Sequence, residues 1–168
     1  RNLTHSRLME ILNYNRETGI LTWKKSLGRR TPIGGQPGTV MKKGYRRVAI
    51  DGNFYMAHHL AWFYVTRRWP FDQIDHINGI RDDNRICNLR EATGSQNARN
   101  SKKPITNTSG YKGVSFRKDR KMTSTSWMAY IRVNEKKLHL GFYRTAAEAH
   151  SAYCAAAIRY YGEFARAA

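Results

Sequence analysis

Acidic residues are scarce in this chain of 168 residues. Twelve Asp and Glu stand against 30 Lys and Arg, which gives a formal net charge of +18. Such an excess destabilises a compact chain by self-repulsion, so it favours an acidic partner, and nucleic acid is the commonest one. Cysteine is nearly missing as well, because Cys87 and Cys154 are too few for a disulfide framework or a zinc knuckle.

Long apolar runs are also missing. No stretch approaches the roughly 18 apolar residues that a membrane span needs, and no secretory segment is visible at the start. Hydrophobic residues still make up 40% and aromatic residues 12% of the chain, which excludes wholesale disorder. We therefore expect a reduced, cytoplasmic protein that binds DNA or RNA, with no membrane partner and no small-molecule cofactor.

The window between Glu17 and Asp51 contains no acidic residue. Its eight basic residues are Lys24, Lys25, Arg29, Arg30, Lys42, Lys43, Arg46 and Arg47. The same window holds Pro32, Gly34, Gly35, Pro37 and Gly38, which break regular structure. We interpret the window as an arm that lies along phosphates, since neutralising acids are absent. A solvated loop with a basic rim is the alternative.

Short regular elements surround this arm. The spacing of Leu8, Ile11 and Leu12 predicts a helix, and residues 20–23 read as a strand. The sequence Asp51-Gly52-Asn53 between residues 45–50 and 54–56 predicts a β-hairpin, followed by a helix over residues 57–67. Residues 98–110 are polar and hold one Pro and one Gly, which is typical of a linker.

The most informative stretch begins at Asp75-His76 and continues to Asn97. Phosphodiester hydrolysis needs a divalent cation and a base for the attacking water. Asp and Asn supply hard oxygen ligands for Mg²⁺ or Mn²⁺, and a neutral His is a suitable base near pH 7. On a regular strand Asp75 and His76 would point to opposite faces, so we expect a distortion or a loop that folds over one face.

Three motifs carry a family resemblance. They are Asp75-His-Ile-Asn-Gly79, Asn84-Arg-Ile-Cys-Asn-Leu-Arg90 and Ser95-Gln-Asn97, with Asn88 13 residues after Asp75 and Asn97 9 residues after Asn88. Together with the upstream Ala57–Trp62 segment and Trp69-Pro70, this series resembles the HNH endonucleases of the phage and intron-homing branch. The resemblance implies a ββα-metal fold, in which two antiparallel strands and a helix clasp one divalent cation.

The resemblance also assigns roles. His76 matches the general base, Asp75 the metal ligand of the first strand and Asn97 the ligand on the helix. Asn88 matches the middle Asn, which braces the loop and orients the base. Many family members have His where this chain has Asn97, so we expect Mg²⁺ or Mn²⁺ rather than Zn²⁺.

Other polar residues of this region leave alternatives open. Arg81, Arg85 and Arg90 are expected to contact phosphates, or else to be solvated surface charge. Asp82-Asp83 is an alternative metal site, although turn chemistry is the commoner use of such a pair. His58 and His59 are expected to be one packed and one solvent-facing residue, with a phosphate or supporting role for His58 as the alternative.

The pattern changes after residue 110. Residues 111–117, 127–133 and 137–143 read as three strands, with turns at Asn134-Glu135 and near Asp119-Arg120. Thr145-Ala-Ala-Glu148 is a capping box that opens an Ala-rich helix ending near Gly162. Alternation places Ala129 and Ile131 toward this helix and turns Tyr130 and Arg132 outward.

This series resembles the ethylene-response-factor (APETALA-two) DNA-binding domain of plants, on the motifs Tyr111–Val114, Trp127–Arg132, Leu140–Tyr143 and Thr145–Ala149. The resemblance implies a sheet that lies in the major groove. Ser115 and Tyr130 depart from the plant pattern, so base specificity does not carry over. The DNA contacts expected along the whole chain are Lys42, Lys43, Arg46, Arg81, Arg85, Arg90, Lys112, Arg117, Arg132 and Lys137.

The sequence thus predicts an α+β chain. It comprises a basic N-terminal extension with a hairpin (1–56), a ββα-metal nuclease core (57–100), a linker (101–110) and a three-stranded antiparallel sheet packed on one helix (111–168). The expected activity is metal-dependent hydrolysis of double-stranded DNA, by a monomer or a DNA-induced dimer encoded by a phage or mobile element. A DNA-binding regulator with an inactive HNH site and an RNA-processing protein are the alternatives.

Overall fold

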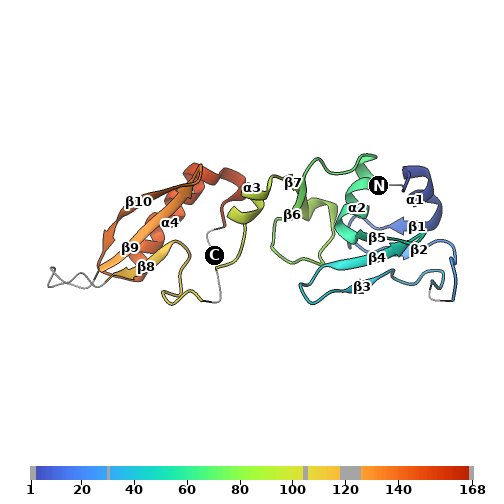
Figure 1. Ribbon diagram of the computed structural model, residues 1–168, viewed down its shortest axis with the longest axis horizontal. Coiled ribbons are helices and arrows are strands. Elements are labelled where there is room, and N and C mark those ends of the chain that lie inside the picture. The colour runs from blue at the N-terminus through green and yellow to red at the C-terminus, as the bar shows by residue number, and fades with distance from the viewer. Residues whose placement is uncertain (1–2, 30, 104–105, 118–125, 167–168) are drawn as a thin grey trace. The chain divides into compact units, whose positions relative to one another are not determined.

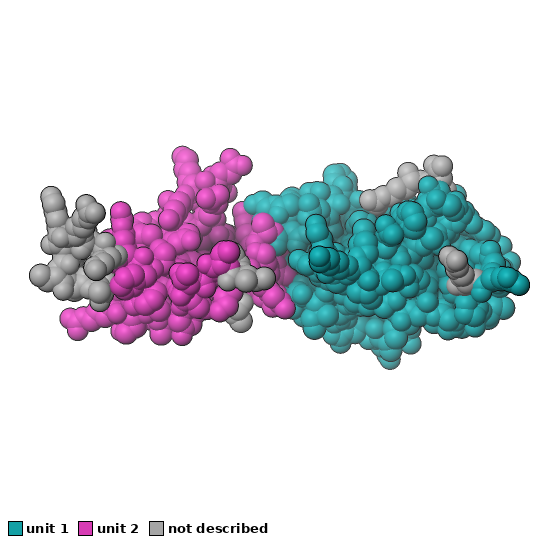
Figure 2. Space-filling model, turned by 60° about the horizontal axis from the view of Figure 1, so that its bottom comes forward, with its two compact units in different colours: residues 1–97 teal, residues 98–168 magenta. Residues whose placement is uncertain are grey.

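The computed structural model describes residues 3–29, 31–103, 106–117 and 126–166. They form two compact units, Arg1–Asn97 and Ala98–Ala168, coloured separately in Figure 2. The mixed α+β class predicted from the sequence is confirmed. No helix in the described ranges is long and apolar enough to cross a membrane. Three predicted features lie outside the described residues: the turn at Asp119-Arg120, the arm residue Arg30 and linker residues 104–105.

The first unit combines short strands with three helices (Figure 1). In chain order its elements are α1 (His5–Ile11), β1 (Leu12–Tyr14), β2 (Leu21–Trp23), β3 (Thr39–Val40), β4 (Arg46–Ile50), β5 (Asn53–Met56), α2 (Ala57–Thr66), β6 (Gln73–His76), the 3₁₀ turn η1 (Ile86–Asn88), β7 (Leu89–Ala92) and α3 (Gly94–Arg99). The strands pair as β1-β2, β3-β4-β5 and β6-β7, all antiparallel.

One hydrophobic core holds this unit together. Leu8 and Ile11 of α1 pack in the same cluster as Leu60 of α2, Ile74 of β6 and Leu89 of β7. The N-terminal extension therefore belongs to the same compact body as the candidate nuclease region. A 97-residue unit can bury enough apolar surface for a core that a segment of about 45 residues rarely achieves alone.

Local signals explain most of the elements. The hairpin β4-β5 turns at Asp51 and Gly52, whose φ angles of 48° and 76° are those of the tight turn that the sequence predicts. The helix predicted over 57–67 is α2. Leu12 was expected in the first helix but begins β1, because it pairs with Trp23 of β2 once α1 has ended at Ile11.

The second unit has the predicted sheet and helix. Its elements are β8 (Val114–Arg117), β9 (Ser126–Val133), β10 (Lys136–Tyr143), α4 (Ala146–Tyr161) and the 3₁₀ turn η2 (Gly162–Phe164), with strand order β10-β9-β8 (Figure 1). Thr145 and Glu148 form the predicted capping box at the start of α4. Ala129 and Ile131 are buried with α4 residues, which confirms the predicted inner face.

Candidate active site

The site is built on the hairpin of β6 and β7 and on the loop between them. His76 ends β6 opposite Leu89 of β7, and the loop of residues 77–88 returns the chain. Asn88 closes this loop: its backbone O accepts from Ile77 N at 2.9 Å, its Oδ1 accepts from Asn78 N at 2.9 Å, and its Nδ2 donates to Asp83 O at 2.8 Å. Asn88 is buried, so each lost hydrogen bond would leave a polar group unsatisfied away from water.

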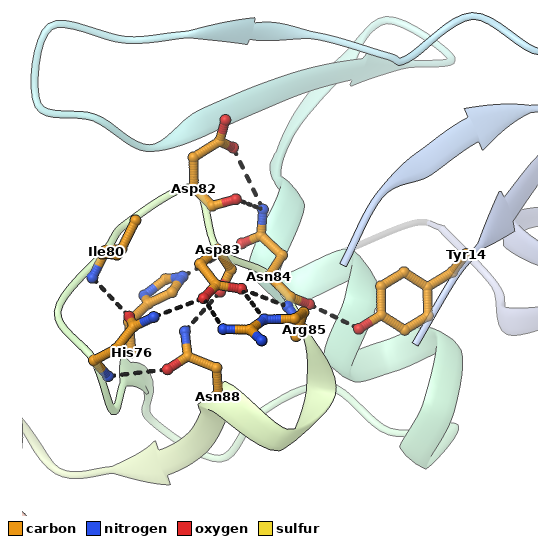
Figure 3. A network of polar contacts seen from close by, with 9 residues as sticks. Tyr14, His76, Ile80, Asp82, Asp83, Asn84, Arg85 and Asn88 are labelled. Carbon is orange, nitrogen blue, oxygen red and sulfur yellow. Dashed lines mark hydrogen bonds and ion pairs between the residues drawn. The ribbon is translucent and has the colours of Figure 1, made fainter. Parts of the chain in front are cut away.

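Asn84 fixes the imidazole of His76. The Nε2 of His76 lies 3.3 Å from Asn84 Oδ1, while Asn84 Nδ2 donates to Asp82 O at 3.1 Å (Figure 3). Because the amide nitrogen of Asn84 faces Asp82, its oxygen faces His76, and Nε2 must carry the proton. In the neutral ring Nδ1 is then the basic nitrogen. Burial lowers the pKa of His76, outweighing the Asn84 contact that raises it, so the ring is neutral at pH 7.

The hairpin of β1 and β2, here called the N-terminal hairpin, contacts the backbone of Asn84. Tyr14 OH donates to Asn84 O at 2.7 Å, and burial raises the pKa of Tyr14 to about 12, which keeps this hydroxyl a donor (Figure 3). Gly19, in the turn between β1 and β2, has φ 73°. A Cβ there would lie 2.3 Å from Arg85 N and 2.5 Å from the carbonyl carbon of Asn84, so only glycine permits this close approach.

Aromatic rings surround His76 on the core side. The His58 ring of α2 meets it edge to face, with centroids 5.1 Å apart, and Tyr45 lies 5.3 Å from His58 and 5.9 Å from His76. His58 is buried, and its Nδ1 has no hydrogen-bond partner among the described residues. Burial, with smaller effects of His59 and His76, lowers the pKa of His58 to about 2. His58 is therefore a neutral, packed ring beside the candidate base.

Asp75 lies on the opposite face of β6 from His76. The β6-β7 ladder stays regular through both residues, without the distortion that a shared face would require. Asp75 is 3% exposed and faces Arg90, its direct partner on β7, whose Nε and Nη2 donate to Oδ2 at 2.9 and 2.8 Å. The structure therefore brings Asp75 together with Arg90, and His76 together with Asn84 and His58.

Asn97 approaches the face of β6 that carries Asp75. Its Nδ2 donates to Gln73 Oε1 at 2.8 Å, and Gln73 shares a strand face with Asp75 because it stands two residues earlier. A carboxylate and a carboxamide are hard oxygen donors that fit Mg²⁺ or Mn²⁺. Among the described residues no group of three His, Cys, Asp or Glu is placed to hold a metal. A cation on this face would have Asp75 and Asn97 as protein ligands, with water and phosphate completing its coordination.

The basic residues near the loop are largely engaged. Arg46 forms a bidentate ion pair with Asp82, and Arg85 forms one with Asp83, whose pKa it lowers to about 2. Asp82 and Asp83 thus serve ion pairs and turn hydrogen bonds. Arg81 donates to Lys43 O and lies over the Tyr45 ring.

These contacts tie the tip of the basic arm to the loop that carries the candidate base. Lys42 and Lys43 are exposed at this tip. The structure therefore places two exposed lysines beside the loop.

In the second unit the predicted DNA contacts fall into two groups. Arg132 and Lys137 are exposed cross-strand partners, and Arg117 is exposed at the end of β8. Lys112 instead donates to the carbonyl oxygens of Arg99 and Ser101 at 2.6 and 2.8 Å, and burial lowers its pKa to about 8. Lys112 therefore holds the chain before the sheet.

Four residues of the site, Tyr14, Gly19, Tyr45 and Asn84, carry no role that the sequence alone predicts. Asn84 does stand inside a recognised motif, which was a usable signal. The others lie 31 or more positions before His76, and only the tertiary fold brings them to it.

Comparison with known proteins concerns the segment that carries this site. Residues 55–99 match the HNH endonuclease family. The matched segment contains α2, the β6-β7 hairpin, its loop and α3, so the candidate base, the bracing Asn88 and both candidate ligands fall inside it. The match of this segment to the family suggests a nuclease, and nucleases of this family typically use a divalent metal.

A phage protein is also similar to the chain. Protein 3.8 of Escherichia phage T7 is 37% identical over 86 residues, which are 49% of this chain and 66% of that protein. The similarity thus spans just under two thirds of the phage protein. No solved structure matches the chain significantly. The HNH match leaves out the β8-β10 sheet and α4.

Proposed function

We propose that the chain is a metal-dependent endonuclease that hydrolyses phosphodiester bonds of double-stranded DNA. The observation that carries this proposal is the 3.3 Å contact of His76 Nε2 with Asn84 Oδ1, inside a segment that matches HNH endonucleases. Because an amide oxygen only accepts, this contact assigns the ring proton to Nε2. A neutral imidazole with a defined basic nitrogen is what a general base requires near pH 7.

The position of each candidate site residue suggests its role in the reaction. His76 Nδ1 takes the proton of the attacking water, and Asn84 holds the ring so that this nitrogen is the basic one. Asn88 keeps the loop closed behind His76. On the other face of β6 from His76, Asp75 and Asn97 would hold Mg²⁺ or Mn²⁺, which when bound would stabilise negative charge on the phosphate and the leaving oxygen. A phosphate that meets both groups must therefore lie past the end of β6, where the strand stops at His76. When the cation is bound, Arg90 must share the Asp75 carboxylate with it or release that carboxylate.

Basic side chains hold the DNA through its phosphates. The chain has 18 more basic than acidic residues, and the exposed Lys42 and Lys43 lie beside the loop that carries His76. Phosphate contacts of this kind position a duplex but read no sequence. Recognition of a site is therefore assigned to the β8-β10 sheet, which also carries exposed basic residues. Deleting residues 98–168 should leave metal-dependent cutting with relaxed site choice.

The test is nicking of supercoiled plasmid with Mg²⁺ or Mn²⁺ and with EDTA. His76→Ala should lower the rate by about 10²- to 10⁴-fold, the usual contribution of a general base, while DNA affinity stays near wild type. Added imidazole should restore part of the rate by replacing the lost ring. Asp75→Ala and Asn97→Ala should lose metal affinity, with partial rescue by excess Mn²⁺. Wild-type rates in His76→Ala would remove this residue from the mechanism.

One observation favours a second candidate, a DNA-binding regulator without nuclease activity. Arg90 already neutralises Asp75 through two hydrogen bonds, so a cation must compete for that carboxylate. The regulator would bind duplex DNA with salt-dependent affinity but would cut none in either metal. An RNA-processing protein, by contrast, would bind RNA in a way that duplex DNA competes poorly.

A further inference from the structure

The β8-β10 sheet has an outer face that α4 does not cover. Ala129 and Ile131 of β9 are buried against α4, so the alternating positions Met128, Tyr130 and Arg132 lie on the other side. Their direct partners on β10 are Phe142, His139 and Lys137 in the same order. We call these six residues the outer face.

The two ends of the outer face differ in polarity: one end is basic and the other is apolar. Arg132 and Lys137 form its basic end, where Lys137 Nζ lies 3.8 Å from the centre of the Tyr130 ring. Phe142 and Met128 form its apolar end. Phe142 is 53% exposed, and among the described residues its ring meets that of His139, with centroids 4.6 Å apart. Water thus covers much of a phenyl ring at one end and two cations at the other.

The charge of this surface selects its partner. None of the six outer-face residues is acidic, and residues 98–168 hold 14 Lys and Arg against 4 Asp and Glu. A polyanion fits the basic end. The apolar end needs an apolar group at a short distance from that polyanion. On the base edges of duplex DNA such a group is the C5-methyl of thymine, and it is displayed in the major groove, which is wide enough for a β-ribbon.

We propose that Phe142, supported by Met128, contacts the 5-methyl group of thymine in the major groove and gives the chain a preference for thymine at one or two positions of its site. This inference rests on the proposed function, in which the sheet binds duplex DNA. It assigns phosphate or guanine contacts to the Arg132–Lys137 end and a methyl contact to the Phe142–Met128 end.

The experiment uses the full chain carrying His76→Ala, so that bound DNA is not cut. A preferred duplex is first selected from a random-sequence pool. It is then resynthesised with uracil in place of one thymine at a time, because uracil pairs with adenine in the same way and lacks only the methyl group. We expect about a fourfold loss of affinity at one or two positions, the effect of leaving one carbon group unburied, and no change elsewhere.

Two variants connect the loss to the proposed contact. Phe142→Ala should bind the thymine and uracil duplexes with equal affinity. Phe116→Ala is the matched control: Phe116 is 48% exposed but pairs with Trp127 on the other face, so this variant should keep the fourfold difference.

Four outcomes would overturn the inference. Tight binding with no uracil-sensitive position, or a difference that survives in Phe142→Ala, would refute the methyl contact and leave the endonuclease proposal standing. Self-association of the chain that Phe142→Ala abolishes would assign the apolar end to a second copy. Absence of any binding to duplex DNA would refute the DNA-binding part of the proposed function as well.

Discussion

Arg90 lies directly opposite Asp75 in the β6-β7 ladder and donates from both Nε and Nη2 to a single oxygen, Oδ2, of the Asp75 carboxylate. Both side chains are largely buried, with 13% and 4% of their surfaces exposed. A buried carboxylate without a counter-charge is costly, so Arg90 stabilises the protein when no cation is bound. A divalent cation bound at Asp75 would therefore compensate the same charge as the guanidinium.

The first prediction concerns this ion pair. Arg90→Met should lower the free energy of unfolding by about 3–5 kcal/mol without metal, because it removes the guanidinium that pairs with the buried Asp75 carboxylate. Saturating Mn²⁺ should raise the melting temperature more in this variant than in the wild type. Thermal unfolding with and without Mn²⁺ measures both effects.

Two controls accompany the Arg90 measurement. Arg68→Met removes a more exposed ion pair, with Glu91, and should cost less than about 1 kcal/mol. The double variant Asp75→Asn/Arg90→Met removes both charges and should recover most of the lost stability. An equal Mn²⁺ shift in wild type and Arg90→Met would mean that no cation binds at Asp75.

The second prediction concerns pH and His58. Burial lowers the folded-state pKa of His58 from 6.5 to about 2, so below pH 6.5 the unfolded chain takes up a proton that the folded chain does not. Stability should therefore be full above pH 6.5 and should fall as the pH drops toward the folded-state pKa, by up to about 1.4 kcal/mol per pH unit from this one group. Urea unfolding over this range measures the slope.

His58→Leu isolates that contribution. The variant should lose stability less steeply below pH 6.5, although His76, whose pKa is lowered in the same direction, leaves part of the slope. Comparison at pH 8, where both imidazoles are neutral in both states, gives the packing cost of the substitution itself. An unchanged slope would show that His58 is protonated in the folded protein.

The third prediction concerns the support of His76 by the N-terminal hairpin. Tyr14→Phe removes the hydroxyl that holds Asn84 O, and Gly19→Ala puts a methyl group against the backbone of Asn84 and Arg85. Both should lower the cleavage rate at saturating DNA and leave DNA affinity nearly unchanged, since they shift the loop that orients His76 and touch no candidate phosphate contact.

Tyr55→Phe is the matched control for Tyr14→Phe. Tyr55 is also buried, but its hydroxyl makes no hydrogen bond with the described residues, and its ring stacks on Trp69. This variant should cut at the wild-type rate. If Tyr14→Phe did the same, the hairpin would support the stability of the loop but not the orientation of the base.

Local sequence signals were sufficient for much of the fold. The Asp51-Gly52 turn, the Thr145–Glu148 capping box and the turn at Asn134-Glu135 each depend on neighbouring residues, and each was predicted. The partner of Asp75 could not be predicted, because it depends on the register of β6 against β7. The joining of α1 to the core around Leu60 depends on contacts between residues about fifty positions apart, which no short pattern records.

The candidate site, like the fold, could be predicted only in part from the sequence. Its residue types and their spacing indicated an HNH-like region, which the family match supports. Which nitrogen of His76 is basic depends on Asn84, Asp82 and Tyr14 acting together, and this arrangement exists only in the folded protein.

The irregular step in β10 has a consequence for the behaviour of the protein at high concentration. Pairing with β9 shifts between His139 and Gly141, and β10 is an edge strand that starts with Lys136 and Lys137. A bulge and adjacent lysines both disfavour the docking of a foreign strand along such an edge. The chain therefore exposes the phenyl ring of Phe142 on this strand without offering a flat template for intermolecular sheet growth.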